Sequence, residues 1–94
     1  MLNYLMEDLY KDIVPLLKKV PDDERERAEN LTTAIQEKIS KSNNAFDINV
    51  WYGKTGYIRD EVARFENHTD VHVADFGAKI KWLLTKAPYF YSDD

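Results

Sequence analysis

The sequence contains no cysteine and little glycine or proline, with three of each among its 94 residues. Without cysteine, the chain forms no disulfide and no zinc site with thiolate ligands. No apolar run reaches the ~18 residues of a membrane-spanning helix. The N-terminus is acidic where a secretory signal would be basic. We therefore predict a cytoplasmic protein that does not interact with a membrane.

An excess of one charge sign is also missing, because 17 acidic residues face 13 basic ones and the formal net charge is only −4. This mild negative charge disfavours non-specific binding to nucleic acids or anionic lipids. Hydrophobic residues make up 44% of the chain and aromatic residues 13%, which is too rich for a disordered protein. The length fits one domain. We predict a single small globular domain over residues 1–94, with an aromatic C-terminal tail over 87–94.

The N-terminal half shows the spacing of two helices. Apolar residues recur three and four positions apart over residues 2–20. Pro15 interrupts this pattern and predicts either a kink or a new helix that begins with Asp12 as its cap. A second helix is predicted from Pro21 to about Lys41, with a narrow apolar stripe of Ala28, Leu31, Ile35 and Ile39.

The middle of the chain changes to a period of two. The alternating apolar residues are Phe46, Ile48, Val50 and Tyr52. Turn-forming residues follow at 53–56, and residues 57–59 again look extended, so we predict a β-hairpin with a four-residue loop. Residues 58–66 fit either a strand or a short helix with Ile58, Val62 and Phe65 on one face.

The C-terminal part predicts one more strand and one more helix. Residues 71–75 alternate and indicate a third strand. The last helix is expected to have Asp75 as its N-cap and to end at Pro88. The predicted fold class is therefore α+β, with two N-terminal helices, a short antiparallel hairpin or meander, and a C-terminal helix. The alternative is an all-helical bundle in which residues 45–57 form a long loop.

The sequence offers no convincing catalytic group. His68 and His72 could share a metal if they lay on one helix. In the predicted turn and strand they do not, so we expect a structural or exposed pair, with a weak metal site or a pH switch as alternatives. The chain has no cysteine nucleophile, and its serines lie in turn-like or tail segments. We predict that the protein is not an enzyme and has no cofactor and no metal.

Aromatic residues gather at two places that are candidates for binding a partner. One is the predicted hairpin and the other is the tail. Aromatic and arginine side chains dominate the energetics of many protein interfaces, and aromatic rings also stack on bases. The candidate partner-binding residues are Trp51, Tyr52, Lys54, Tyr57 and Arg59 in the hairpin and Tyr89, Phe90 and Tyr91 in the tail.

These features lead to two functional hypotheses. The first is a small non-enzymatic protein-binding module that acts as an inhibitor, an immunity-type protein or a regulator of a larger protein. The alternative is a homo-oligomeric protein that binds a nucleotide or single-stranded nucleic acid. The expected partner is another protein or a second copy of the chain. Nucleotides and nucleic acids are less favoured, because Asp60 and Glu61 cancel the charge of the neighbouring cations.

Overall fold

The computed structural model describes residues 3–90, and within this range the chain is helical and contains no β-strand. The molecule measures 40 × 25 × 20 Å along its principal axes. The prediction of an α+β fold is therefore wrong, and the all-helical alternative gives the correct class. The long loop that this alternative placed at residues 45–57 is also wrong, because most of that segment is helical.

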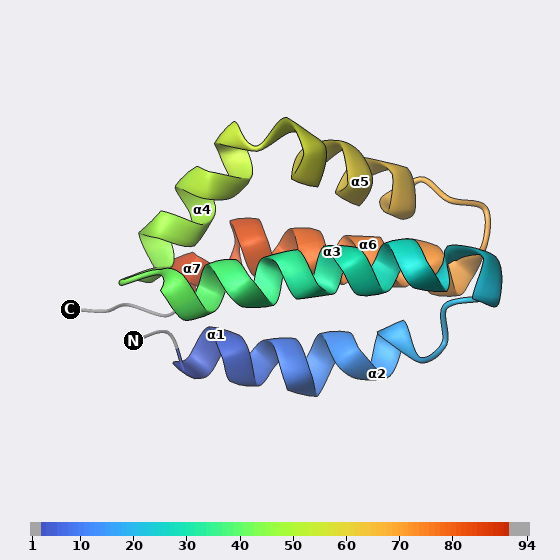
Figure 1. Cartoon of the computed structure of the whole chain (residues 1–94), viewed down its shortest axis with the longest axis horizontal. Coiled ribbons are helices and arrows are strands. Elements are labelled where there is room, and N and C mark those ends of the chain that lie inside the picture. The colour runs from blue at the N-terminus through green and yellow to red at the C-terminus, as the bar shows by residue number, and fades with distance from the viewer. Residues whose placement is uncertain (1–2, 91–94) are drawn as a thin grey trace.

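The N-terminal segment is one continuous helical rod. It consists of α1 (Asn3–Asp8), the π-helical turn η1 (Leu9–Ile13) and α2 (Val14–Leu17), as Figure 1 shows. In a regular helix the ring of Pro15 would clash with the carbonyl group of Lys11. Here the turn before the proline is wider, because the Val14 N–H donates to the carbonyl of Leu9, five residues earlier. The proline is thus accommodated by a π-turn, and no new helix begins at Asp12.

Helix α3 (Asp22–Lys41) confirms the second predicted helix. Its buried face carries the four apolar residues of the predicted stripe. Acidic residues fill the first turn, where they interact favourably with the helix dipole. Arg25 fixes the connection to α2, because its guanidinium donates to the carbonyl of Lys18 at 3.1 Å and to the carbonyl of Val20 at 2.6 and 2.9 Å.

Helix α4 (Ala45–Lys54) occupies the segment that was predicted as the first strand. The Asn44 side chain accepts from the Asp47 N–H at 3.0 Å, and the Asp47 carboxylate accepts from the Asn43 N–H at 3.1 Å. This reciprocal cap satisfies two N–H groups at the start of the helix. A helix satisfies its backbone locally, whereas a two-stranded hairpin is marginal by itself. No other described segment supplies a third strand, so the helix is the more stable choice.

The predicted hairpin loop is a bend between two helices. Thr55 has an extended backbone (φ −99°, ψ 94°) and separates α4 from α5 (Gly56–Glu66). Residues 57–59 are therefore helical and not a strand. Ile58, Val62 and Phe65 are buried on one face of α5, which confirms the helical alternative for residues 58–66.

Helix α6 (Val71–Thr85) begins where the third strand was predicted. The Asp70 carboxylate accepts from the N–H groups of His72 at 2.8 Å and Val73 at 3.2 Å, so Asp70 is the N-cap. The prediction of a cap at Asp75 is wrong, because that residue lies a full turn inside the helix. Pro88 does not mark the end of α6. It is buried in the short helix α7 (Ala87–Phe90) that follows.

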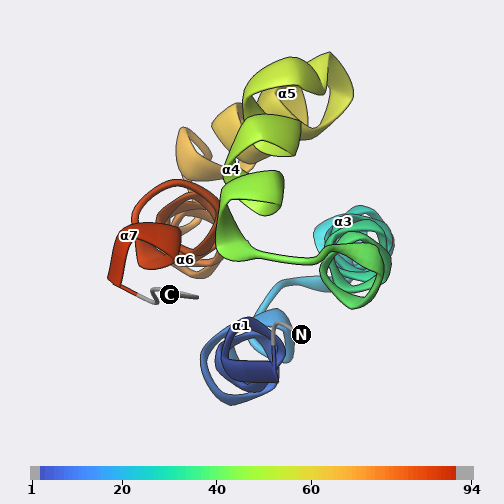
Figure 2. The same ribbon diagram turned by 90° about the vertical axis from the view of Figure 1, so that its left-hand side faces the viewer.

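The helices form a bundle with four sides around one core. Viewed along the long axis, these sides are α1–α2, α3, α6–α7, and the bent pair α4–α5 (Figure 2). The aromatic rings of Phe65 on α5 and Phe76 on α6 meet edge to face, with centroids 5.4 Å apart. The fully or nearly fully buried apolar residues are Leu5, Leu9, Ile13, Val20, Ala28, Leu31, Ile35, Ile39, Ala45, Ile48, Ile58, Val62, Phe65, Val73, Phe76, Ile80, Leu83, Leu84 and Ala87.

Candidate functional site

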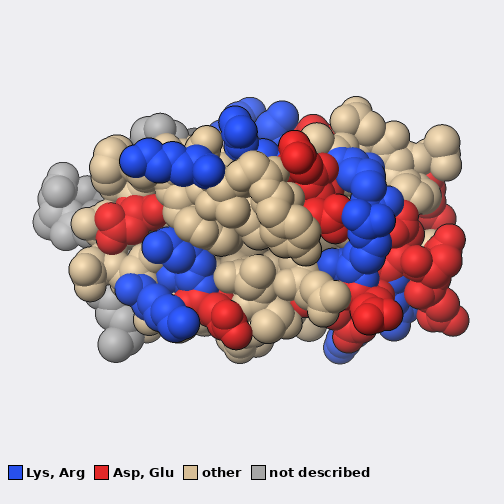
Figure 3. All heavy atoms as spheres, turned by 45° about the horizontal axis from the view of Figure 1, so that its top comes forward, with Lys and Arg blue, Asp and Glu red and all other residues tan. Residues whose placement is uncertain are grey.

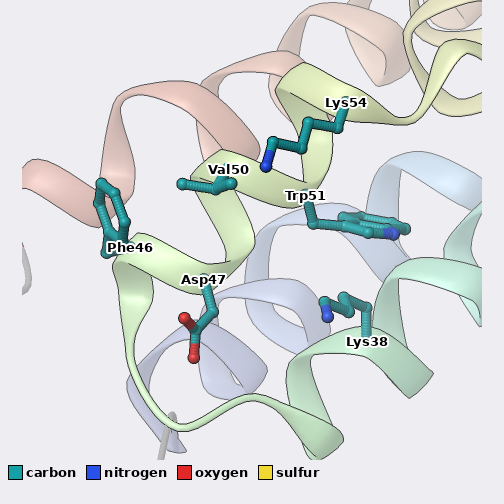
Figure 4. A pocket seen from close by; sticks show the side chains of 6 residues that line it. All are labelled: Lys38, Phe46, Asp47, Val50, Trp51 and Lys54. Atoms are coloured by element: carbon teal, nitrogen blue, oxygen red, sulfur yellow. The ribbon is translucent and has the colours of Figure 1, made fainter.

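A surface groove lies between α4 and the C-terminal half of α3. Its volume is about 320 Å³. Figure 4 shows Trp51 and Lys38 extending into the space between the two helices, while Val50 and Phe46 extend from another side of α4. We call this surface the α4 groove. The residues that line it are Lys38, Phe46, Asp47, Val50, Trp51 and Lys54.

The groove is partly apolar because some of the apolar residues of α4 lie outside the core. Ala45 and Ile48 are buried in the core, and Trp51 packs against it while partly exposed. The helical rotation of 100° per residue turns Phe46 and Val50 away from that buried face. Phe46 is 70% exposed, the highest value among the large hydrophobic residues of the described chain. The outer face of α4 therefore exposes apolar side chains that the described part of the chain does not cover.

Two lysines flank the apolar part of the groove. Within residues 3–90, neither Lys38 nor Lys54 forms an ion pair. Asp47 lies in the same groove, and one of its carboxylate oxygens accepts the hydrogen bond from Asn43. On the side of the molecule that carries α4 and α5, a broad uncharged area has basic side chains beside it, and acidic side chains gather toward the right-hand end (Figure 3).

The structure divides the residues predicted in the hairpin between different surfaces. Trp51 and Lys54 lie together in the α4 groove. Tyr52 does not line it. The Tyr52 side chain packs against the core, and burial raises the pKa of its phenol. Tyr57 and Arg59 are exposed on α5, beyond the bend at Thr55, and are not among the groove residues. The five residues therefore do not form a single patch.

The predicted tail surface falls mostly outside the described side chains. The backbone of Tyr89 and Phe90 forms part of helix α7. Tyr91 lies outside the described residues.

Sequence reasoning missed four residues of the groove, namely Lys38, Phe46, Asp47 and Val50. Phe46 and Val50 had been placed on one face of a strand together with Tyr52. The available signal was Asn44 followed three positions later by Asp47, which resembles a capping pattern at a helix start. Lys38 comes from a different helix, so no local pattern could assign it to this groove.

A second cluster of polar residues joins α3 to α5. Arg64 donates to both carboxylate oxygens of Glu24 at 2.8 Å, and Arg27 pairs with Glu61. Glu24 and Glu61 are both buried, with 7% of their surface exposed. The hydrogen bond from Arg64 lowers the pKa of the Glu24 carboxyl. The carboxylates are thus compensated by cations, as buried charges need to be.

His68 belongs to this ion-pair cluster. Its Nδ1 accepts from the Asp70 N–H at 3.0 Å, so in the neutral ring Nε2 carries the proton and donates to Glu24 at 3.0 Å. His72 is exposed in the first turn of α6. The two histidines therefore have different surroundings. Among residues 3–90 no group of three or more His, Asp or Glu side chains is arranged to hold a metal ion.

Two further depressions flank Trp82 on α6, with volumes of about 450 and 240 Å³. The Lys79 ammonium lies 4.8 Å from the centre of the Trp82 ring, and Lys81 pairs with Glu66. Lys79 and Lys81 thus already have partners near Trp82, whereas neither Lys38 nor Lys54 has an ion pair within residues 3–90.

The comparisons with known proteins give no relative. No protein-family model, no curated protein and no solved structure matches the chain. None of the described helices combines the length and apolar character needed to cross a membrane. The site must therefore be interpreted from its own geometry.

Proposed function

We propose that this chain is a non-enzymatic protein-binding module that acts as an inhibitor, an immunity-type protein or a regulator of a larger protein, and that the α4 groove is its contact surface. The observation that carries the proposal is the exposure of Phe46 beside the half-buried Val50 and Trp51. Isolated exposed apolar residues are common on protein surfaces, but a contiguous group with a polar rim is typical of an interaction site.

The charges of the groove define the chemistry of the partner. The Lys38 and Lys54 ammonium groups have no ion pair within residues 3–90, and their aliphatic stems extend the apolar surface. A partner segment with an apolar anchor and acidic residues beside it would complement this surface. The indole of Trp51 would form one wall of the anchor's site, as tryptophan does in many interface hot spots.

The same residues give the groove little capacity for catalysis. Its ionisable side chains are Lys38, Asp47 and Lys54, and Asp47 is held by the helix cap. Acid–base catalysis most often uses histidine or carboxyl groups that are free to exchange a proton, and the groove lining contains no histidine and only the carboxyl group of Asp47. The groove is less suited to a nucleic acid, because Arg59 is not among the residues that line it with Trp51.

Site-specific photo-crosslinking tests the proposal. A photoreactive phenylalanine analogue replaces Phe46, and as a matched control the same analogue replaces Val71, which is 63% exposed at the start of α6. Both proteins are irradiated in lysate of the source organism. We expect the position 46 variant to give a discrete adduct with another protein, and the position 71 variant not to give it.

Competition shows whether this adduct reflects binding. Excess unlabelled wild-type chain should abolish it, whereas excess F46E should not, because a carboxylate in the apolar groove opposes the acidic partner segment. The activity of the captured protein is then measured with and without the chain. Equal labelling from positions 46 and 71, or equal competition by wild type and F46E, would overturn the proposal.

A further inference from the structure

The charges of α4 have an order that suits a second copy of the same helix. Asp47 and Lys54 are seven residues apart, so they lie on one face two turns from each other, about 10 Å along the axis. Val50 and Trp51 lie midway between them. The face therefore has an acidic end, an apolar centre and a basic end.

We infer that the α4 groove pairs with the α4 groove of a second copy, with the two helices antiparallel about a two-fold axis near Val50. This inference rests on the proposed function, because it assigns an occupant to the same surface. In a two-fold interface every contact occurs twice. Asp47 of each copy then lies opposite Lys54 of the other, and the apolar centres cover each other.

The shape of the face supports the same arrangement. Gly53 lies on the same side of α4 as Phe46, and the space where its side chain would be is empty. In the antiparallel pair, a two-fold axis at Val50 brings Phe46 of one copy across from Gly53 of the other, and Asp47 across from Lys54, each within about 1.5 Å of exact register along the axis. The exposed ring of Phe46 thus finds a gap at the position where a larger residue would block it.

The size of α4 limits the strength of this pair. Ten residues of helix span about 15 Å, and such a contact lies at the small end of specific interfaces. The pair is therefore weak and depends on concentration. Because it covers Phe46 and Val50, self-pairing competes with any partner for the α4 groove, and a partner must displace the second copy.

Charge exchange tests the pairing. Sedimentation equilibrium of the wild type should show a shift from the monomer mass of 11.0 kDa toward twice that value as concentration rises. Asp47→Lys places two lysines on the face, and Lys54→Asp places two aspartates there. For each variant alone, the dissociation constant of the dimer should be at least tenfold higher than for the wild type. Their equimolar mixture should regain it as a mixed pair, because both contacts are again between opposite charges.

Two controls keep the result interpretable. Circular dichroism establishes that each variant is helical, and Asp47→Asn keeps an oxygen that can accept from Asn43 while it removes the charge. Asp47→Asn should also weaken the pair, by less than Asp47→Lys. A wild type that stays monomeric up to millimolar concentration, or a mixture that stays monomeric, would overturn the pairing. Neither result affects the crosslinking test, in which an adduct with another protein differs in mass from an adduct between two copies.

Discussion

The contact between α5 and α6 makes Gly77 the position where the smallest substitution should have a large effect. Gly77 is buried in α6, and a Cβ atom built on it would overlap the backbone nitrogen of Glu66 and lie 2.8 Å from the carbonyl carbon and Cβ of Phe65. Real Cβ atoms essentially never approach other atoms so closely. Two of these atoms belong to the α5 backbone, so relief requires the helices to move apart and not merely a change of rotamer.

The expected cost follows from two opposing effects. Alanine is favoured over glycine inside a helix by up to ~1 kcal/mol. Overpacking a core costs about 1–3 kcal/mol, and more where the neighbours are rigid. Because two of the overlapped atoms are backbone, the overpacking cost lies in the upper part of that range, about 2–3 kcal/mol or more, and the net loss for Gly77→Ala is about 1–2 kcal/mol or more. In a domain of this size each kcal/mol changes Tm by roughly 4–8 °C, so the Tm should fall by roughly 4–16 °C.

The matched control is Gly53→Ala in α4, where the added Cβ meets no atom within 4 Å. This variant should gain up to ~1 kcal/mol from helix propensity. Thermal unfolding followed by circular dichroism, at low protein concentration, measures both changes. A Gly77→Ala variant as stable as the wild type, or more stable, would refute the close approach of α5 and α6.

Three other predictions concern the ion-pair cluster and the helix caps. The pKa of Glu24 is lowered in the folded state. Its contribution to stability should therefore be complete above about pH 5 and decline as the pH falls below the ordinary value of 4.5. Thermal melting at different pH values should show that E24Q loses less stability on acidification than the wild type does. E24Q itself should cost about 1–3 kcal/mol at pH 7 by denaturant unfolding, less than for a fully buried pair because Arg64 keeps a third of its side chain exposed. Asp70→Ala should cost ~1 kcal/mol by the same measurement, and Asp75→Ala should cost less than half of that. A larger cost for Asp75→Ala than for Asp70→Ala would instead support Asp75 as the N-cap, as predicted from the sequence.

Part of the fold could be predicted from the sequence because the signal was long enough. Residues 22–41 carry an apolar stripe over several helical turns, and the structure places α3 there. The segments 46–52 and 71–75 are too short for a period of two to exclude a helix. Their apolar side chains fit either a helix or a strand. The cap residues Asn44 and Asp70 precede the alternating positions on which the strand predictions were based.

The structure distributes the predicted partner-binding residues of the hairpin over different surfaces. Trp51 and Lys54 line the same groove because residues three apart are neighbours on a helix, whereas on a strand they would point to opposite faces. Tyr52 was assigned to the same surface, and only the rotation of α4 turns it toward the core. Lys38 joins the groove from α3, and the bend at Thr55 separates Tyr57 and Arg59 from it.

The sequence by itself determined the composition, the absence of thiol chemistry and the helical character of residues 22–41. It also contained the cap residues, whose hydrogen bonds reach only two to four positions along the chain. The tertiary structure decided which faces are covered. Glu24 and Glu61 are buried because cations from another helix or the next turn reach them, and Phe46 remains exposed because no described helix packs over that side of α4. Burial depends on neighbours that are distant in sequence, and local patterns do not specify those neighbours.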